Sequence, residues 1–176
     1  MIRKIIAVDL LPMERRAKEF GFPYIPLKEL HDMCAEGDVD VIETLVTLPE
    51  RQPENDTPEA VAKAHVQHVN KRNALQLSGA RVIECPSKRS QSTPSGFKQS
   101  DDQRLMLTTL MLAMKLRPDF VMLFAADGDF APMVELLRQE GIRTEVVASP
   151  TMLASELCRH AVNVVDYDEL LKSVKR

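Results

Sequence analysis

The chain has few of the residues that cross-link or anchor small exported proteins. Its 176 residues include only three cysteines, Cys34, Cys85 and Cys158, which lie far apart and form no Cys-x-x-Cys pair. This spacing suggests neither a disulfide framework nor a zinc knuckle. No uninterrupted apolar stretch approaches the roughly 18 residues of a membrane span, and the amino-terminal segment lacks the apolar stretch of a signal peptide. We therefore expect reduced cysteines, a cytoplasmic location and no contact with a membrane.

Aromatic residues and net charge are also scarce. Phe, Tyr and Trp together make up 5% of the chain, Trp is absent, and the formal net charge is −3. A platform for stacking bases is therefore not expected, and neither is binding of nucleic acid through overall positive charge. Any polyanion would have to meet a local basic patch or a bound cation. The 44% hydrophobic content suits one core, so we expect a single domain over residues 1–176.

Strand-like and helix-like segments alternate along the sequence. Strands are expected over 2–9, 39–48, 81–85, 120–126, 143–148 and 163–165, and helices over 13–20, 27–36, 58–77, 100–116, 131–140, 152–160 and from about 167. The polar stretch at about 86–97 predicts a mobile surface loop. This alternation predicts a three-layer α/β fold with a central, mainly parallel sheet covered by helices on both faces.

Acidic residues stand where the predicted strands end. The apolar strand from Phe120 runs directly into Asp127 and Asp129, and Asp9 closes the first strand. Ligands of parallel sheets bind beyond the carboxyl ends of the strands, and Asp101 and Asp102 begin a helix that starts at the same edge. Carboxylates about 5 Å apart repel by roughly 3 kcal/mol per pair, so the cluster needs protons or cations. Oxygen ligands without His or Cys suit Mg²⁺ or Mn²⁺ rather than zinc.

Each of these residues also has a purely structural interpretation. An Asp at a helix start stabilises that helix, which would explain Asp101 or Asp102, and Asp129 can cap the next helix. The convergence of several carboxylates on one edge is what favours metal binding. His65 and His68 lie three residues apart on a predicted helix, but no third ligand accompanies them, so a solvated helix face is the better interpretation.

With these motifs in place, the sequence resembles the NYN domain of the PIN-like metal-dependent ribonucleases. The likeness rests on the strand leading to Asp127-Gly-Asp129-Phe130, on Pro132 and the helix that follows, on Asp9, and on Lys98-Gln-Ser-Asp101. It implies hydrolysis of RNA, with Asp9, Asp101, Asp127 and Asp129 as catalytic metal ligands. It also implies that Lys98 contacts the scissile phosphate. The spacing from Lys98 favours Asp101 over Asp102.

Three basic residues are candidates for substrate binding. Lys88, Arg89 and Lys98 lie in or beside the polar loop, near the proposed edge, where they could follow the phosphates of a single strand. A solvated loop is an equally good interpretation of the same residues.

Two departures from the family pattern keep another function open. Asp9 is followed by Leu10-Leu11-Pro12 instead of the usual Gly, variable residue and Asn, and Ala125 and Ala126 stand where Ser or Thr commonly precedes the acidic turn. The alternative is a catalytically weak module that binds RNA or protein. A Toprim-like phosphoryl-transfer domain is less favoured, because that fold has a Glu at the end of its first strand, where this chain has Asp9.

One predicted helix is apolar on more than one side. Its apolar residues run from Leu105 to Met114. This pattern predicts a central helix buried beneath the sheet, with a homodimer interface as the alternative.

Overall fold

A single parallel sheet runs through the centre of the molecule. The computed structural model describes residues 1–89, 97–98 and 100–175. Within this part of the chain, six strands pair in the order β3-β2-β1-β6-β7-β8, and every neighbouring pair is parallel. They are β1 (Ile2–Val8), β2 (Val39–Pro49), β3 (Arg81–Cys85), β6 (Phe120–Phe124), β7 (Arg143–Ala148) and β8 (Asn163–Asp166). The predicted parallel sheet is confirmed.

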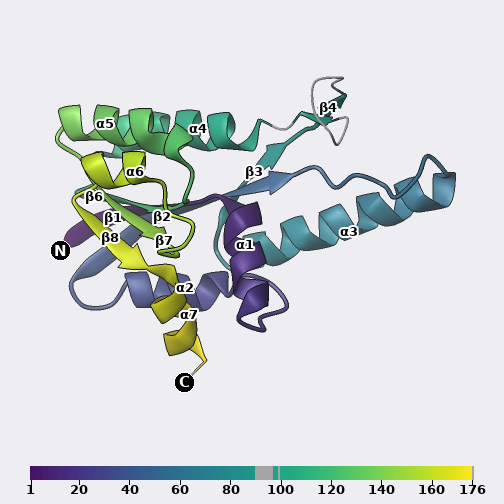
Figure 1. The fold of residues 1–176 in the computed structure, drawn as a ribbon, viewed down its shortest axis with the longest axis horizontal. Helices are drawn as coiled ribbons and strands as arrows, with labels where there is room; N and C mark the ends of the chain where they lie inside the picture. Colours follow the sequence, from purple (N-terminus) through teal and green to yellow (C-terminus); the bar gives the residue numbers. More distant parts are fainter. Residues whose placement is uncertain (90–96, 99, 176) are drawn as a thin grey trace.

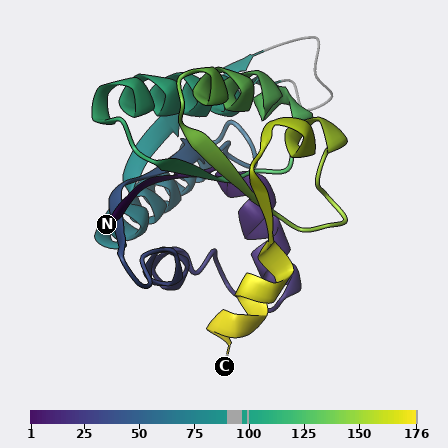
Figure 2. The same ribbon diagram turned by 90° about the vertical axis from the view of Figure 1, so that its left-hand side faces the viewer.

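Helices cover both faces of this sheet (Figures 1 and 2). One layer holds α4 (Asp101–Leu116) and α5 (Ala131–Gln139), with α6 (Ser155–His160) packed beside α5. The other layer holds α1 (Leu10–Glu19), α2 (Leu27–Cys34), α3 (Pro58–Leu77) and α7 (Tyr167–Val174). The predicted three-layer α/β fold is therefore confirmed. None of the helices in the described residues combines the length and apolar character that a membrane crossing requires.

The core lies on both sides of the central strands. Ile5 to Val8 of β1 and Val121 to Phe124 of β6 are buried, as continuous apolar runs are when helices cover both faces of a sheet. Phe124 meets the ring of Tyr167 edge-to-face, with centroids 6.1 Å apart. The buried Tyr167 hydroxyl donates to the carbonyl of Met13 at 3.2 Å, so this ring holds α7 against α1 near the carboxyl end of β6.

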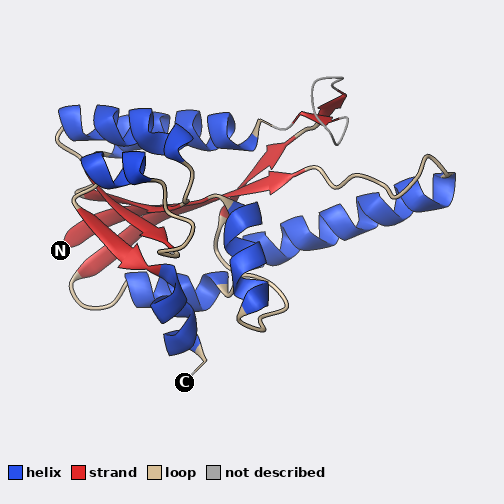
Figure 3. Cartoon of the chain, viewed as in Figure 1, coloured by secondary structure: helices blue, strands red, loops and turns tan. Residues whose placement is uncertain are grey.

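The longest helix extends past the sheet (Figure 3). The start of α3 follows the predicted pattern, because Thr57 accepts a hydrogen bond from the Ala60 amide and Pro58 occupies the first turn. Only Ala64 and Leu75 of this helix are buried. Most of α3 is therefore surface, and it contributes little to the core.

Several local structures differ from the sequence expectation, among them α6, which begins at Ser155 and not at Met152. Helix α1 begins at Leu10, directly after Asp9, and not at Met13. The predicted loop contains a short antiparallel pair, β4 (Lys88–Arg89) and β5 (Phe97–Lys98), which the sequence did not signal because neither segment shows apolar alternation. Residues 90–96, on which the rest of that expectation falls, lie outside the described residues.

Helix α4 is only partly buried. Leu105, Leu112 and Ala113 pack inward, whereas Leu107 and Met111 are 69% and 57% exposed. The helix packs against the sheet as expected, but its opposite face is exposed, because α4 lies in an outer layer with one face toward solvent. The alternative homodimer interface stays a prediction.

Candidate functional site

The acidic residues lie where the order of the sheet reverses. From β1 the chain first adds β2 and β3 on one side of β1, and later adds β6, β7 and β8 on the other. Asp9 directly follows β1, and Asp127 follows the neighbouring strand β6 after two alanines. In parallel sheets this reversal opens a crevice at the carboxyl ends of the strands, which is the usual place for a ligand.

Backbone contacts from two neighbouring strands hold Asp9 in place. Its amide donates to the carbonyl of Phe124 at 2.9 Å. The buried hydroxyl of Thr47 on β2 accepts from the Leu10 amide at 3.0 Å and donates to the carbonyl of Val8 at 3.4 Å. Thr47 therefore fixes the residues on either side of Asp9. The sequence analysis missed this positioning residue, because a Thr in a strand gives no signal of its partner.

The side chain of Asp9 is buried but poorly satisfied. It is 5% exposed, and it makes no capping hydrogen bond although Asp9 stands at the N-cap of α1. Its Oδ1 atom is buried and has no hydrogen-bond partner in the described part of the chain. A buried carboxylate oxygen in this state costs free energy, because nothing replaces its lost hydration. A cation in the pocket would supply the missing partner.

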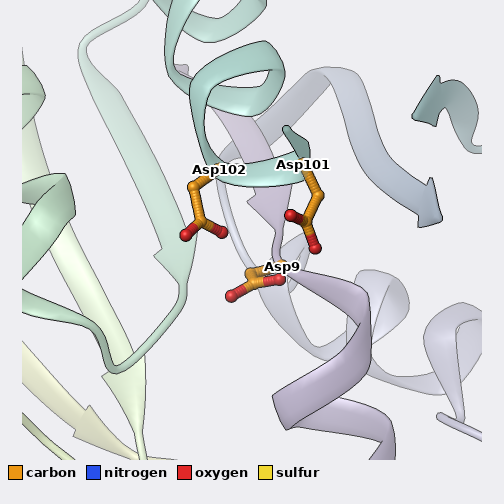
Figure 4. Close-up of side chains that lie close together, drawn as sticks. All are labelled: Asp9, Asp101 and Asp102. Atoms are coloured by element: carbon orange, nitrogen blue, oxygen red, sulfur yellow. The ribbon is translucent and has the colours of Figure 1, made fainter. Parts of the chain in front are cut away.

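The start of α4 brings two more carboxylates to Asp9. Asp101 and Asp102 are the first two residues of the helix, and Figure 4 shows both side chains pointing toward Asp9. One carboxylate oxygen from each of the three residues lies within 4.8 Å of the others. All three oxygens could therefore face a single ion.

A second group of carboxylates overlaps with the first. Oxygens of Asp102, Asp127 and Asp129 also lie within 4.8 Å of one another. The turn that carries Asp127 and Asp129 is a short 3₁₀ helix, η1 (Gly128–Phe130), in which Asp127 Oδ1 accepts from the Asp129 amide at 3.0 Å. Fully buried Phe130 anchors this turn. Asp102 belongs to both groups, so it connects the carboxylates of Asp9 and Asp101 with those of Asp127 and Asp129.

Burial and mutual repulsion change the acidity of the cluster. Burial, followed by repulsion from Asp102, Asp101 and Asp127, raises the pKa of Asp9 from 3.8 to about 7. Burial, followed by repulsion from Asp101, raises the pKa of Asp102 to about 6. Without a cation the protein thus keeps protons on carboxylates that would otherwise be ionised. The oxygen-only donor set and the unpartnered Asp9 oxygen both fit a hard divalent cation.

Four of the five carboxylates line an open pocket of about 560 Å³. Its lining residues are Asp9, Leu11, Pro12, Arg15, Asp101, Asp102, Ala126, Asp127, Gly128, Met152 and Ala154. The sequence analysis did not single out Arg15, because it placed the start of α1 three residues too late. Asp is a common N-cap residue, so Asp9 could have been recognised as the start of this helix. A helix that starts there places Leu11, Pro12 and Arg15 on one face.

The structure brings together the four acidic residues that were predicted as metal ligands, Asp9, Asp101, Asp127 and Asp129, and it places Asp102, which the spacing had made the weaker candidate, in both groups. Lys88 pairs with Lys98 in the β4–β5 ribbon, next to Arg89, but the side chains of these three residues lie outside the described part of the structure. The Nε2 atom of His68 lies 3.1 Å from a carboxylate oxygen of Glu84, and His65 is exposed. Neither histidine belongs to either acidic group.

The pKa values predict that metal binding depends on pH. Because Asp9 and Asp102 hold protons below about pH 7 and about pH 6, a cation must displace these protons as the pH falls. We expect the apparent affinity for Mn²⁺ to fall at least about tenfold between about pH 8 and about pH 5.5. Isothermal titration calorimetry in buffers of different ionisation enthalpy would measure both the affinity and the protons released. An affinity that does not change over this range would contradict binding of the cation by Asp9 and Asp102.

Comparison with solved structures identifies a chain of the same fold. A protein of unknown function from Vibrio parahaemolyticus is 20% identical, with a TM-score of 0.68 over 96% of this chain and 94% of the other. MurG from Acinetobacter baumannii is 13% identical, with a TM-score of 0.48 over 93% of this chain and 41% of the other, a likeness too weak to bear on function. The first likeness concerns the fold alone. Among curated proteins, no sequence matches.

A family model gives a more specific result. The model of the NYN domain matches residues 33–169, which include Asp101, Asp102, Asp127 and Asp129. Asp9 precedes the matched span, in the region where the sequence departs from the family pattern. The match extends over most of the chain and agrees with the resemblance inferred from the acidic motifs. The chain therefore belongs to the NYN domain family, within the PIN-like nuclease superfamily.

Proposed function

We propose that this protein is a metal-dependent ribonuclease that hydrolyses phosphodiester bonds of RNA in the cytoplasm. The observation that carries the proposal is the convergence of five carboxylates from three distant chain segments into two overlapping groups, four of them lining one pocket, together with the buried, unpartnered oxygen of Asp9. Membership of the NYN family supports RNA as the substrate. The oxygen-only ligand set favours Mg²⁺ or Mn²⁺ as the cofactor.

In this proposal the carboxylates hold the cation and no side chain acts as a nucleophile. Oxygens of Asp9, Asp101 and Asp102 form one group of possible ligands, and oxygens of Asp102, Asp127 and Asp129 form a second group that shares Asp102. Because Asp127 already accepts a hydrogen bond through Oδ1, its Oδ2 is the oxygen left for a ligand. When bound, a divalent cation would lower the pKa of a water, polarise a phosphoryl oxygen and offset charge on the leaving oxygen.

One observation favours a second candidate function. Ala125 and Ala126 are buried at the carboxyl end of β6, where the family usually places a hydroxyl group near the acidic turn. With this polar support missing, the chain could be a catalytically weak module that binds RNA or protein. The two candidates differ in metal uptake, because a module that does not need a cation would take up no Mn²⁺ at millimolar concentration in calorimetry.

The direct test measures cleavage of a labelled single-stranded RNA with Mg²⁺ or Mn²⁺ and with a chelator. We expect the wild type to cleave only with metal, and Asp127→Asn to lower the rate by about 10²-fold or more, since metal positioning supplies several kcal/mol and about 1.4 kcal/mol is worth tenfold. The Asn side chain keeps an oxygen that can accept from the Asp129 amide, so the fold should be unchanged by circular dichroism. An Asp127→Asn protein as active as the wild type would end the ribonuclease proposal.

A further inference from the structure

Arg15 is the only positively charged residue among the described residues that line the acidic pocket. It follows Leu11 by one turn of α1, on the same helical face, and its side chain is exposed. Within the described part of the chain, Arg15 makes no ion pair and no side-chain hydrogen bond. An unpaired guanidinium beside a group of carboxylates is thus available to an anion that enters the pocket.

The neighbouring Arg16 makes the contrast clear. Its guanidinium binds the Asp168 carboxylate at two points, with Nε to Oδ1 at 2.9 Å and Nη2 to Oδ2 at 2.6 Å. Asp168 also accepts a hydrogen bond from Ser149, and the Arg16 pair joins α1 to α7. Arg16 therefore stabilises the packing of α1 against α7. Arg15, one residue earlier and on a different helical face, lines the pocket instead.

Apolar side chains flank the same pocket. Leu11 on α1 is 40% exposed, and Met152, in the segment between β7 and α6, is 37% exposed. An acidic lining that fits cations, one free guanidinium and two apolar edges match an anion whose neighbouring groups have apolar faces. A phosphodiester within a polynucleotide has this composition, because its single negative charge lies between two nucleosides whose bases have apolar faces. Inorganic phosphate lacks the flanking groups.

We propose that Arg15 is the phosphate-binding residue of this pocket. Its guanidinium donates to a non-bridging oxygen of the RNA phosphodiester that lies over the aspartates, and Leu11 and Met152 contact the adjoining nucleosides. The planar fork of arginine matches phosphate geometry, and hydrogen bonds between charged groups are the strong ones. This assignment rests on the proposed function, and it names the residue that allows a pocket rich in carboxylates to accept an anionic substrate.

The test compares Arg15→Ala and Arg15→Lys with the wild type. Binding of a labelled single-stranded RNA is measured by fluorescence anisotropy with Ca²⁺, which takes the same kind of oxygen ligands as Mg²⁺, over a series of salt concentrations. We expect Arg15→Ala to raise the dissociation constant about tenfold and to reduce the slope of log K against log salt by about 0.7, the value for one phosphate contact on a single strand. Arg15→Lys should recover part of the affinity, because it keeps the charge but not the fork.

Arg138 provides the matched control. It is an exposed arginine in the last turn of α5, which leads away from the carboxyl edge of the sheet, and it has no ion pair among the described residues. Arg138→Ala should bind RNA as the wild type does. Equal binding by Arg15→Ala and the wild type would overturn the assignment, and so would an equal loss in both alanine variants or no RNA binding by the wild type.

Failure of this inference can be told apart from failure of the ribonuclease proposal. If the wild type binds RNA through Arg15 but cleaves none with Mg²⁺ or Mn²⁺, the phosphate contact stands and the hydrolytic function is wrong. If the wild type cleaves RNA and Arg15→Ala keeps the same KM, the function stands and the role of Arg15 is wrong.

Discussion

Replacing Asp102 with Asn should lower metal-dependent RNA cleavage about 10³-fold, whereas Asp101→Asn should lower it only about tenfold. The reason is geometric, since Asp102 belongs to both groups of converging carboxylates and Asp101 to one. Loss of the Asp102 charge would weaken cation binding at both ends of the pocket. Loss of Asp101 would leave the group of Asp102, Asp127 and Asp129 intact.

Single-turnover cleavage at saturating Mn²⁺ would measure both variants against the wild type. Asp32→Asn is the control, because Asp32 is an exposed residue of α2 outside both acidic groups. It should cleave at the wild-type rate. If Asp101→Asn proves as damaging as Asp102→Asn or more so, Asp101 is the principal ligand, as its spacing from Lys98 suggested.

Asp9→Asn should have opposite effects on activity and on stability. Cleavage should fall by at least about tenfold, because the buried carboxylate at the end of β1 no longer attracts a cation to the group of Asp9, Asp101 and Asp102. The metal-free protein should nevertheless become more stable. Since burial and neighbouring charges raise the pKa of Asp9 from 3.8 to about 7, its ionised form costs the metal-free fold on the order of 4 kcal/mol above pH 7. We expect a net gain of about 2 kcal/mol, because the Asn amide is itself a buried polar group.

The gain in stability should depend on pH in a defined direction. Between pH 3.8 and about pH 7 the folded state keeps a proton on Asp9 that the unfolded chain has released. The contribution of Asp9 to stability therefore falls as the pH rises through this window. The advantage of Asp9→Asn should be largest at about pH 8 and should vanish at about pH 4.

Urea unfolding with a chelator, at several pH values, would measure this difference. Added Mn²⁺ should stabilise the wild type more than Asp9→Asn, because ligand binding stabilises only the state that binds it and the variant has lost one of the ligand oxygens. A variant less stable than the wild type at pH 8 would show that Asp9 is held by favourable contacts and not strained by repulsion.

Most of the fold could be predicted because its signals are local. Apolar runs such as Ile5 to Val8 and Val121 to Phe124 are typical of strands buried on both faces, and Thr57-Pro58 marked the start of α3 where the structure has it. The alternation of such segments was enough to predict the layers. The β4–β5 ribbon was not predictable in the same way, because each of its strands is two residues long.

The acidic pocket was predictable only in part. Strand ends placed Asp9 and Asp127 on one edge, because parallel strands end together. The choice between Asp101 and Asp102 depends on how α4 is rotated about its axis, since consecutive helical residues point about 100° apart. This rotation is fixed by the packing of Leu105 and Leu112 against the core, which no local pattern encodes. The contact of Thr47 with the residues around Asp9 likewise joins positions that are distant in the sequence.

No short segment of the chain contains all the carboxylates of the pocket. These carboxylates come from the end of β1, the start of α4 and the turn after β6, so they first meet when residues up to 129 have joined one sheet. A nascent or truncated chain that stops before this turn carries at most three of the five. Under the proposed function, a chain still being synthesised would therefore gain its complete set of metal ligands only after residue 129 has been added and the sheet has formed.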